Sequence, residues 1–202
     1  MQLDVVFSIS VLILSVVVHE VSHGWVASYL GDPTARLQGR LTLNPLPHID
    51  PIGSVLVPLL LFFTNAGVMF GWARPVPVNP YNLKGKYGEA IVAAAGPLSN
   101  IFLAFVFGLL IRVGVALPDS FLHIATLVVI INIVLAIFNL VPIPPLDGSK
   151  ILFSFLPYHL QSIRDSLERW GFFIVLIFIV FLWQFLTPVI GTVFSLLTGI
   201  SL

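Results

Sequence analysis

The chain has 202 residues, of which 58% are hydrophobic and only 9% are charged, and its mean hydropathy is +1.06. A soluble domain carries about 25% charged residues, so this composition excludes a water-soluble protein. Nine basic residues balance nine acidic ones, which argues against a nucleic-acid partner, and the lack of cysteine excludes thiol and disulfide chemistry. The sequence therefore predicts an integral membrane protein in contact with the lipid bilayer, with residues 1–202 forming a single domain.

Four apolar blocks are long enough to cross a bilayer, because a span needs about 20 predominantly apolar residues. They cover residues 3–30, 89–117, 121–141 and 170–185. Pro188 interrupts the pattern after the last block, and residues 189–202 are predicted either to extend that block with a kink or to form a short extra segment. The charged and apolar residues at 156–169 predict a helix that lies at the membrane interface.

The stretch between the first two spans carries three different patterns. Residues 31–51 alternate between apolar and polar side chains, which predicts a short membrane-associated β-hairpin whose edge at 35–43 would pair with an extended substrate. Residues 52–70 are apolar but contain Pro58 and a polar break at 64–67, so they are predicted to enter the membrane and return. The proline-rich residues 74–82 predict an extended loop.

The sequence His19-Glu-Val-Ser-His23 stands near the end of the first span. Residues four apart share one face of a helix, so both imidazoles can bind one metal ion, as in the HExxH motif of zinc metalloproteases. Glu20 can then act as a general base towards a water molecule whose pKa the metal lowers. Ionisable side chains inside a span are costly to insert, which favours a functional site over an accidental match.

A catalytic zinc site of this kind needs one more protein ligand. Asp147 is the best placed, because it follows a span and lies in a segment where three prolines and Gly148 make the backbone irregular. The alternative for Asp147 is a solvated loop residue. The other candidates are Asp4, Asp32, Asp50, Glu89, Asp119, Asp165, Glu168 and the remaining histidines.

Three motifs together resemble the site-2 protease family of intramembrane zinc metalloproteases. These are the His19–His23 motif, Gly96-Pro-Leu-Ser-Asn100 and Asn139-x-x-Pro-x-Pro-x-x-Asp147-Gly148. The stretches at 31–34, 39–45, 48–53 and 71–79 are similar to the compact prokaryotic branch of that family, which lacks PDZ and CBS domains. The resemblance therefore covers almost the whole chain.

The resemblance implies an intramembrane zinc metalloendopeptidase that hydrolyses peptide bonds in or near the transmembrane helices of other membrane proteins. It implies one Zn²⁺ per chain, held by His19, His23 and Asp147, with Glu20 as the catalytic base. It also implies a prokaryotic plasma membrane as the location. The implied fold is an all-α polytopic membrane protein with about four to six transmembrane helices, the β-hairpin and a re-entrant segment after the first helix.

Two further residues are candidates for substrate binding or oxyanion stabilisation. Asn139 lies two helical turns before Asp147 and can donate to a substrate carbonyl or an oxyanion, with helix packing as the alternative. His48 can approach the metal or hold its own loop in place. Asn100 and Asn132 are interpreted as hydrogen-bonding residues between helices.

A different class of function also fits the His and Asp cluster: a polytopic metal carrier or transporter without enzymatic activity. Glu20 favours the protease, because a carrier needs no base beside its metal. A carrier would also be expected to show two-fold internal repetition, which the sequence lacks.

The zinc site constrains the topology. His19 to His23 lie towards the C-terminal end of the first span and Asp147 lies just beyond that of the third, so these two spans must run in the same direction. A re-entrant 52–70 segment then places eight of the nine basic residues on one side, with only Arg112 on the other. By the positive-inside rule the eight lie in the cytoplasm, which predicts an active site near the cytoplasmic side and an N-terminus outside.

Overall fold

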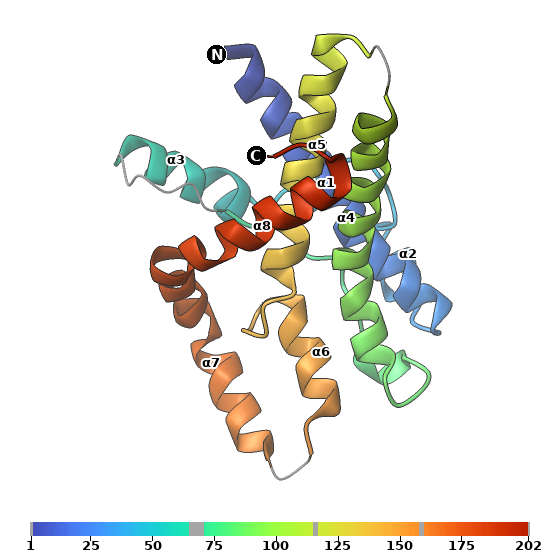
Figure 1. Cartoon of the computed structure of the whole chain (residues 1–202). Coiled ribbons are helices and arrows are strands. Elements are labelled where there is room, and N and C mark those ends of the chain that lie inside the picture. The colour runs from blue at the N-terminus through green and yellow to red at the C-terminus, as the bar shows by residue number, and fades with distance from the viewer. Residues whose placement is uncertain (1, 65–70, 115–116, 158–159, 202) are drawn as a thin grey trace.

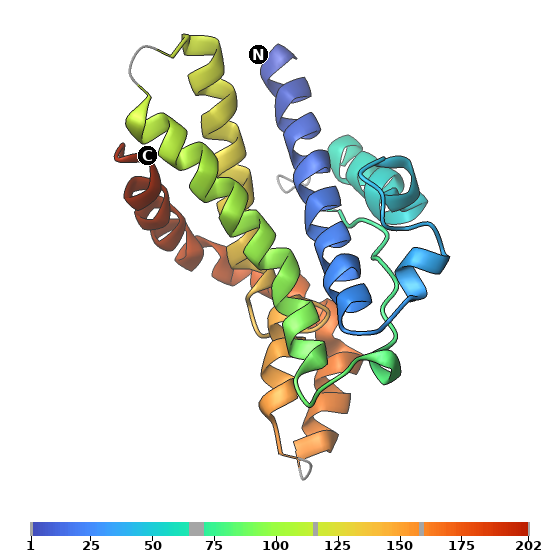
Figure 2. The ribbon, with the colours of Figure 1, turned by 90° about the vertical axis from the view of Figure 1, so that its right-hand side faces the viewer.

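The computed structural model describes residues 2–64, 71–114, 117–157 and 160–201. Its longest elements are three apolar helices: α1 (Gln2–Tyr29), α4 (Gly88–Val113) and α5 (Asp119–Asn139). They contact one another pairwise, and α1 and α5 run in the same direction while α4 runs in the opposite one (Figures 1 and 2). A helix satisfies its backbone hydrogen bonds internally, which is why these sequences form helices in a lipid environment.

The number of crossing helices depends on the C-terminal part of the chain. Among the described residues, α1, α4 and α5 are long and apolar enough to span a membrane. Helix α7 (Gln161–Ile177), the π-helical turn η5 (Phe178–Leu182) and α8 (Trp183–Thr198) follow, and a bend of 73° separates their two halves. If the two halves are counted as one broken span, they form a fourth span in addition to α1, α4 and α5. The prediction of a helical membrane protein is confirmed.

Short elements connect the spans. They are α2 (Thr34–Leu37), η1 (Leu46–His48), η2 (Pro51–Leu56), α3 (Val57–Phe63), η3 (Pro80–Asn82) and α6 (Asp147–Phe155). Helix α3 lies across the direction of α1 and projects from the side of the bundle (Figures 1 and 2). The predicted polar break at 64–67 lies outside the described residues except for Thr64.

The predicted β-hairpin at residues 31–51 is wrong, since this stretch is fully described and contains no strand. Asp32 accepts hydrogen bonds from both the backbone N–H and the hydroxyl of Thr34, which forms a local turn immediately before the short helix α2. Gly39, with φ of 64°, then reverses the chain. The alternating pattern instead reflects single residues that turn inward, such as the buried Ala35 in the short helix α2 and the buried Arg40 just after it.

Helix α1 ends in a way that fixes the loop beyond it. Gly31 takes a φ of 106°, a left-handed conformation that glycine adopts readily. The N–H of Asp32 donates to the carbonyl of Ala27 at 2.9 Å, which closes the helix in a Schellman-type turn. The fully buried Asp32 carboxylate then accepts from the backbone N–H of Asn79 at 2.7 Å and the side chain of Asn82 at 3.0 Å. These contacts hold residues 79–82 against the end of α1.

Candidate active site

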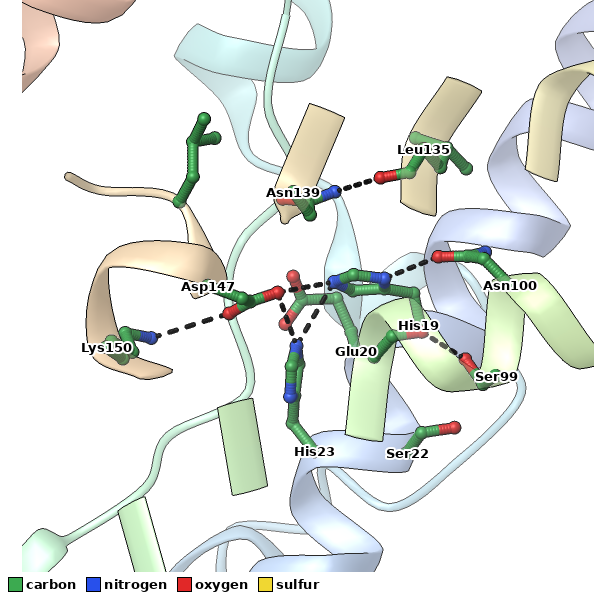
Figure 3. A network of polar contacts seen from close by, with 12 residues as sticks. His19, Glu20, Ser22, His23, Ser99, Asn100, Leu135, Asn139, Asp147 and Lys150 are labelled. Carbon is green, nitrogen blue, oxygen red and sulfur yellow. Dashed lines mark hydrogen bonds and ion pairs between the residues drawn. The ribbon is translucent and has the colours of Figure 1, made fainter. Parts of the chain in front are cut away.

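Helix α1 presents two buried imidazoles towards the middle of the bundle. His19 and His23 are one turn apart, and their Nε2 atoms lie 3.1 Å from each other. The two rings meet edge to face, with centroids 4.7 Å apart. Figure 3 shows both Nε2 atoms directed at the same point. The spacing predicted from the sequence is therefore realised by a regular helix.

Asp147 closes this group from the N-terminus of α6. Its Oδ2 atom lies 3.1 Å from His19 Nε2 and 3.2 Å from His23 Nε2. Helix α5 ends at Asn139, and the proline-containing turn that follows directs the chain back towards α1. Gly148 is needed for this turn, because a side chain there would overlap the Leu140 carbonyl. Oδ1 faces away from the histidines, 3.8 Å from Lys150 Nζ.

The three ligand atoms form a nearly equilateral triangle with sides of 3.1–3.2 Å. Zinc bonds of about 2.0–2.1 Å to nitrogen and oxygen separate neighbouring ligands of a tetrahedron by about 3.3–3.4 Å. The residues present therefore fit a zinc ion that caps the triangle. Two imidazoles and one carboxylate are also a donor set typical of catalytic zinc, which leaves its fourth position open.

Helix α4 holds both imidazoles from behind. His23 Nδ1 donates to the Val92 carbonyl at 2.7 Å, and His19 Nδ1 lies 2.6 Å from Asn100 Oδ1. These bonds occupy the Nδ1 atoms and leave each Nε2 free for a metal. Gly96 lies between the two partners, and a Cβ atom there would overlap the imidazoles of both His19 and His23. The helix backbone therefore approaches the site as closely as glycine allows.

A cavity of about 500 Å³ adjoins the triangle. One wall is the extended, proline-rich chain, as the sequence predicted, with Pro75 to Val78 and Pro80 facing the space. Glu20 also lines the cavity, and its Oε2 accepts a hydrogen bond from the Val76 N–H at 2.8 Å. The buried Arg40 anchors this wall by donating to the carbonyls of Arg74 and Pro75.

The remaining predicted residues occupy different places. Asn139 lines the cavity, and its Nδ2 donates to the Leu135 carbonyl of its own helix at 2.9 Å. His48 is buried in the loop between α2 and η2, where its Nε2 lies 3.0 Å from the Thr42 carbonyl. It is not among the residues that line the cavity. The structure thus brings Asn139 to the site but not His48.

Sequence reasoning missed the contribution of α4. Val92, Gly96 and Asn100 are spaced four residues apart, so they share one face of the helix. That spacing was a usable signal, because a glycine on the face between two hydrogen-bonding positions indicates a close neighbour. The hydrogen bond from the Val76 N–H to Glu20 could not be predicted from the sequence, because every residue except proline has a backbone N–H.

Fold and site together define a helical membrane protein with a buried His, His and Asp group that could hold a metal ion, beside a glutamate. The profile of peptidase family M50 matches residues 111–182. YwhC of Bacillus subtilis is named as a proposed zinc metalloprotease. It is 40% identical to this chain over 186 residues, which cover 88% of this chain and 78% of YwhC. No solved structure matches the chain at a significant level.

Two further relatives match over most of the chain. Rip2 of Mycolicibacterium smegmatis, likewise proposed by its name to be a zinc metalloprotease, is 30% identical over 179 residues, 83% of this chain and 64% of Rip2. Stage IV sporulation protein FB of Bacillus subtilis is 29% identical over 143 residues, 70% of this chain and 48% of that protein. The chain belongs to peptidase family M50, the site-2 protease family. It is an intramembrane metalloprotease whose cofactor is Zn²⁺.

Proposed function

We propose that His19, His23 and Asp147 hold the zinc ion and that Glu20 is the catalytic base. The observation that carries this proposal is the triangle of three ligand atoms, 3.1–3.2 Å apart and buried in the bundle. The carboxylate of Glu20 lines the cavity beside that triangle but is not one of the three ligands. Nothing in the described residues favours the alternative of a metal carrier.

Peptide hydrolysis then follows from the positions of the chain's own groups. The bound zinc ion supplies Lewis acidity for the scissile carbonyl and the attacking water. Glu20 accepts the proton of the water as it attacks and later returns it to the leaving amine. The hydrogen bond from the Val76 N–H fixes one oxygen of Glu20, so the other oxygen is left to face the water.

The substrate we infer is a transmembrane helix of another membrane protein. Its carbonyls are engaged in helical hydrogen bonds, so a segment must unwind before hydrolysis. The cavity has the size of a few extended residues, and its wall is itself extended backbone. Asn139 is proposed to bind the substrate carbonyl or oxyanion, since its Nδ2 uses one N–H for Leu135 and has a second to donate. For His48, the contact with Thr42 supports the loop-holding alternative.

The topology we propose has a re-entrant segment after α1. Support comes from hydrogen bonds that join the two ends of this segment: Trp72 N–H to the Gly53 carbonyl at 3.1 Å and the Ser54 hydroxyl to the Trp72 carbonyl at 2.8 Å. A stretch that begins and ends at one place does not cross the bilayer. The spans are then α1, α4, α5 and the bent α7–α8 pair.

Charge orients this arrangement. Eight basic residues fall on the side where α1 and α5 end, and Arg112 falls on the other. We therefore place the N-terminus outside a prokaryotic plasma membrane and the active site near the cytoplasmic face. Contacts of α4 with α1, α5, α6 and α8 support a single domain over residues 1–202.

Glu20→Gln tests the proposed roles. The amide keeps the size of the side chain but cannot accept a proton, so zinc content should stay at about one ion per chain while peptide cleavage falls by about 10²–10⁴-fold. Zinc is measured by elemental analysis of the purified protein, and cleavage is measured with a reconstituted membrane-protein substrate. Cleavage at the unsubstituted rate would rule out Glu20 as the base.

A further inference from the structure

A chain of buried amides connects α5 to the imidazole of His19. Asn100 and Asn132 are 0% exposed, and Ser15 is 4% exposed. Asn132 Nδ2 donates to the Val128 carbonyl and to the Ser15 hydroxyl, both at 2.9 Å. Asn100 Nδ2 donates to Asn132 Oδ1 at 2.8 Å, and Asn100 Oδ1 lies 2.6 Å from His19 Nδ1. Amides buried in a membrane bundle are costly unless fully paired, and these two are.

Two backbone carbonyls fix the directions of the bonds in this chain: that of Val128, and that of Ser15, to which Asn100 Nδ2 also donates at 3.4 Å. The Val128 carbonyl can only accept, so the amide group of Asn132 nearest to it must be the nitrogen. The oxygen of Asn132 then faces Asn100, which must present its own nitrogen. The oxygen of Asn100 is thereby left for His19 Nδ1.

The orientation of Asn100 determines which nitrogen of His19 is protonated. An oxygen that only accepts requires a proton on His19 Nδ1, and a neutral imidazole has only one N–H. Nε2 therefore carries a lone pair, directed at the triangle with His23 and Asp147. If Asn100 turned its amide over, its nitrogen would face Nδ1, the proton would move to Nε2, and His19 could not bind a metal. The volume of the side chains would be unchanged.

We propose that Asn132 is a positioning residue for the zinc site, acting through Asn100 to fix the Nδ1–H tautomer and the orientation of His19. The proposal rests on the assignment of His19 as a zinc ligand. It replaces the interpretation of Asn100 and Asn132 as residues that only join helices. His23 needs no such chain, because the Val92 carbonyl accepts directly from its Nδ1.

Zinc affinity tests the proposal, measured by competition with a chelator on purified protein in detergent. Asn100→Leu should weaken zinc binding by about 10–100-fold, the usual cost of losing an outer-shell partner. Asn132→Leu should weaken it by about tenfold. The double variant should bind zinc no more weakly than Asn100→Leu, because Asn132 sets the position of the His19 proton only through Asn100, its other contact with α1 being the Ser15 hydroxyl.

Thr198→Val is the matched control. Thr198 is 2% exposed, and its hydroxyl donates to the Phe194 carbonyl one turn earlier in α8, away from the amide chain. The control should bind zinc as the unsubstituted protein does. Unchanged zinc affinity in a folded Asn132→Leu protein would overturn the proposal, and so would additive losses in the double variant.

If Asn132→Leu does not fold, the proposal can still be tested on the unsubstituted protein. Nitrogen-15 spectra of labelled histidines in the zinc-free protein should show His19 protonated on Nδ1. A His19 ring without a proton on Nδ1 would overturn the proposal even if His19 binds zinc. If instead His19 is not a zinc ligand, zinc binding should survive in His19→Ala, which distinguishes this outcome from a failure of the proposal for Asn132.

Discussion

Asp147 connects α6 to the two histidines of α1, and its removal tests the ligand set. Loss of an outer-shell partner already costs about 10–100-fold in metal affinity, so Asp147→Ala should weaken zinc binding by more than about 100-fold and abolish cleavage. Asp119→Ala and Asp165→Ala are controls that keep the ligands intact. Zinc content and turnover are measured on all three proteins. Survival of both in Asp147→Ala would mean that another acid completes the site.

The site depends on the absence of a side chain at Gly96. Replacing glycine by alanine inside a helix ordinarily stabilises the helix by about 1 kcal/mol. At position 96 the added methyl would overlap the imidazoles of His19 and His23, so Gly96→Ala should lose zinc binding while keeping its helical content. Circular dichroism and zinc analysis separate these two effects.

Gly191 provides the matched control, because it also lies within a helix, α8, and nothing lies within 4 Å of a Cβ atom placed on it. Gly191→Ala should leave zinc content and cleavage unchanged. Zinc binding by Gly96→Ala equal to that of Gly191→Ala would show that α4 does not pack against the metal site as described.

At the scale of elements, the junction between α1 and residues 79–82 depends on one carboxylate. Burial alone would raise the pKa of Asp32, but hydrogen bonds from Thr34, Asn82 and Asn79 outweigh it and hold the pKa below 3.8. A lowered pKa means that the stabilisation is complete well above pH 3.8 and is lost as the pH falls through the folded-state pKa.

Asp32→Ala should therefore destabilise the protein by about 1–3 kcal/mol near neutral pH, because it leaves the buried N–H groups unpaired. The difference in unfolding free energy between the two proteins should shrink as the pH is lowered below about 4. Denaturant unfolding in detergent at several pH values measures it. A difference that does not change with pH would contradict the role of the charged form. Asp165→Ala, at an exposed site, should show neither effect.

The elements that could be predicted are those that a continuous stretch of sequence determines by its own composition. The predicted blocks 3–30, 89–117 and 121–141 correspond to α1, α4 and α5, because apolar length is a local property. The 31–51 hairpin failed because the bonds of Asp32 to Asn79 and of Arg40 to Arg74 join residues far apart in sequence. Alternation of polarity cannot distinguish strand pairing from such isolated inward contacts.

The site divides in the same way. The i and i+4 spacing of His19 and His23 is local and could be predicted, and Asp147 was recoverable from its motif. The roles of Asn100 and Asn132 behind the histidines could not be predicted, because an asparagine within a span looks the same in the sequence whether it joins helices or orients another side chain. Only the directions of the bonds around Asn100 and Asn132 distinguish the two roles.

For the whole molecule, the proposed topology can be tested with single cysteines, since the chain has none of its own. Tyr81→Cys suits this test better than Asn82, because the Tyr81 side chain is 98% exposed whereas Asn82 contacts Asp32. Ser120→Cys and Ser162→Cys probe the starts of α5 and α7. An impermeant reagent added to intact cells should label Ser120→Cys alone. Labelling of Tyr81→Cys from outside would refute the re-entrant segment.

The hydrogen bonds between Trp72 and residues 53–54 have a consequence for how this protein can change. They pin the two ends of the intervening chain together, and lengthening a closed loop costs only about 0.6 kcal/mol for each doubling of its length. The cavity wall from Pro75 onward is held by this pinned end and by the hydrogen bonds of Arg40, Glu20 and Asp32. Small changes in the length of the chain between Gly53 and Trp72 should therefore leave the catalytic geometry intact as long as these two hydrogen bonds are kept.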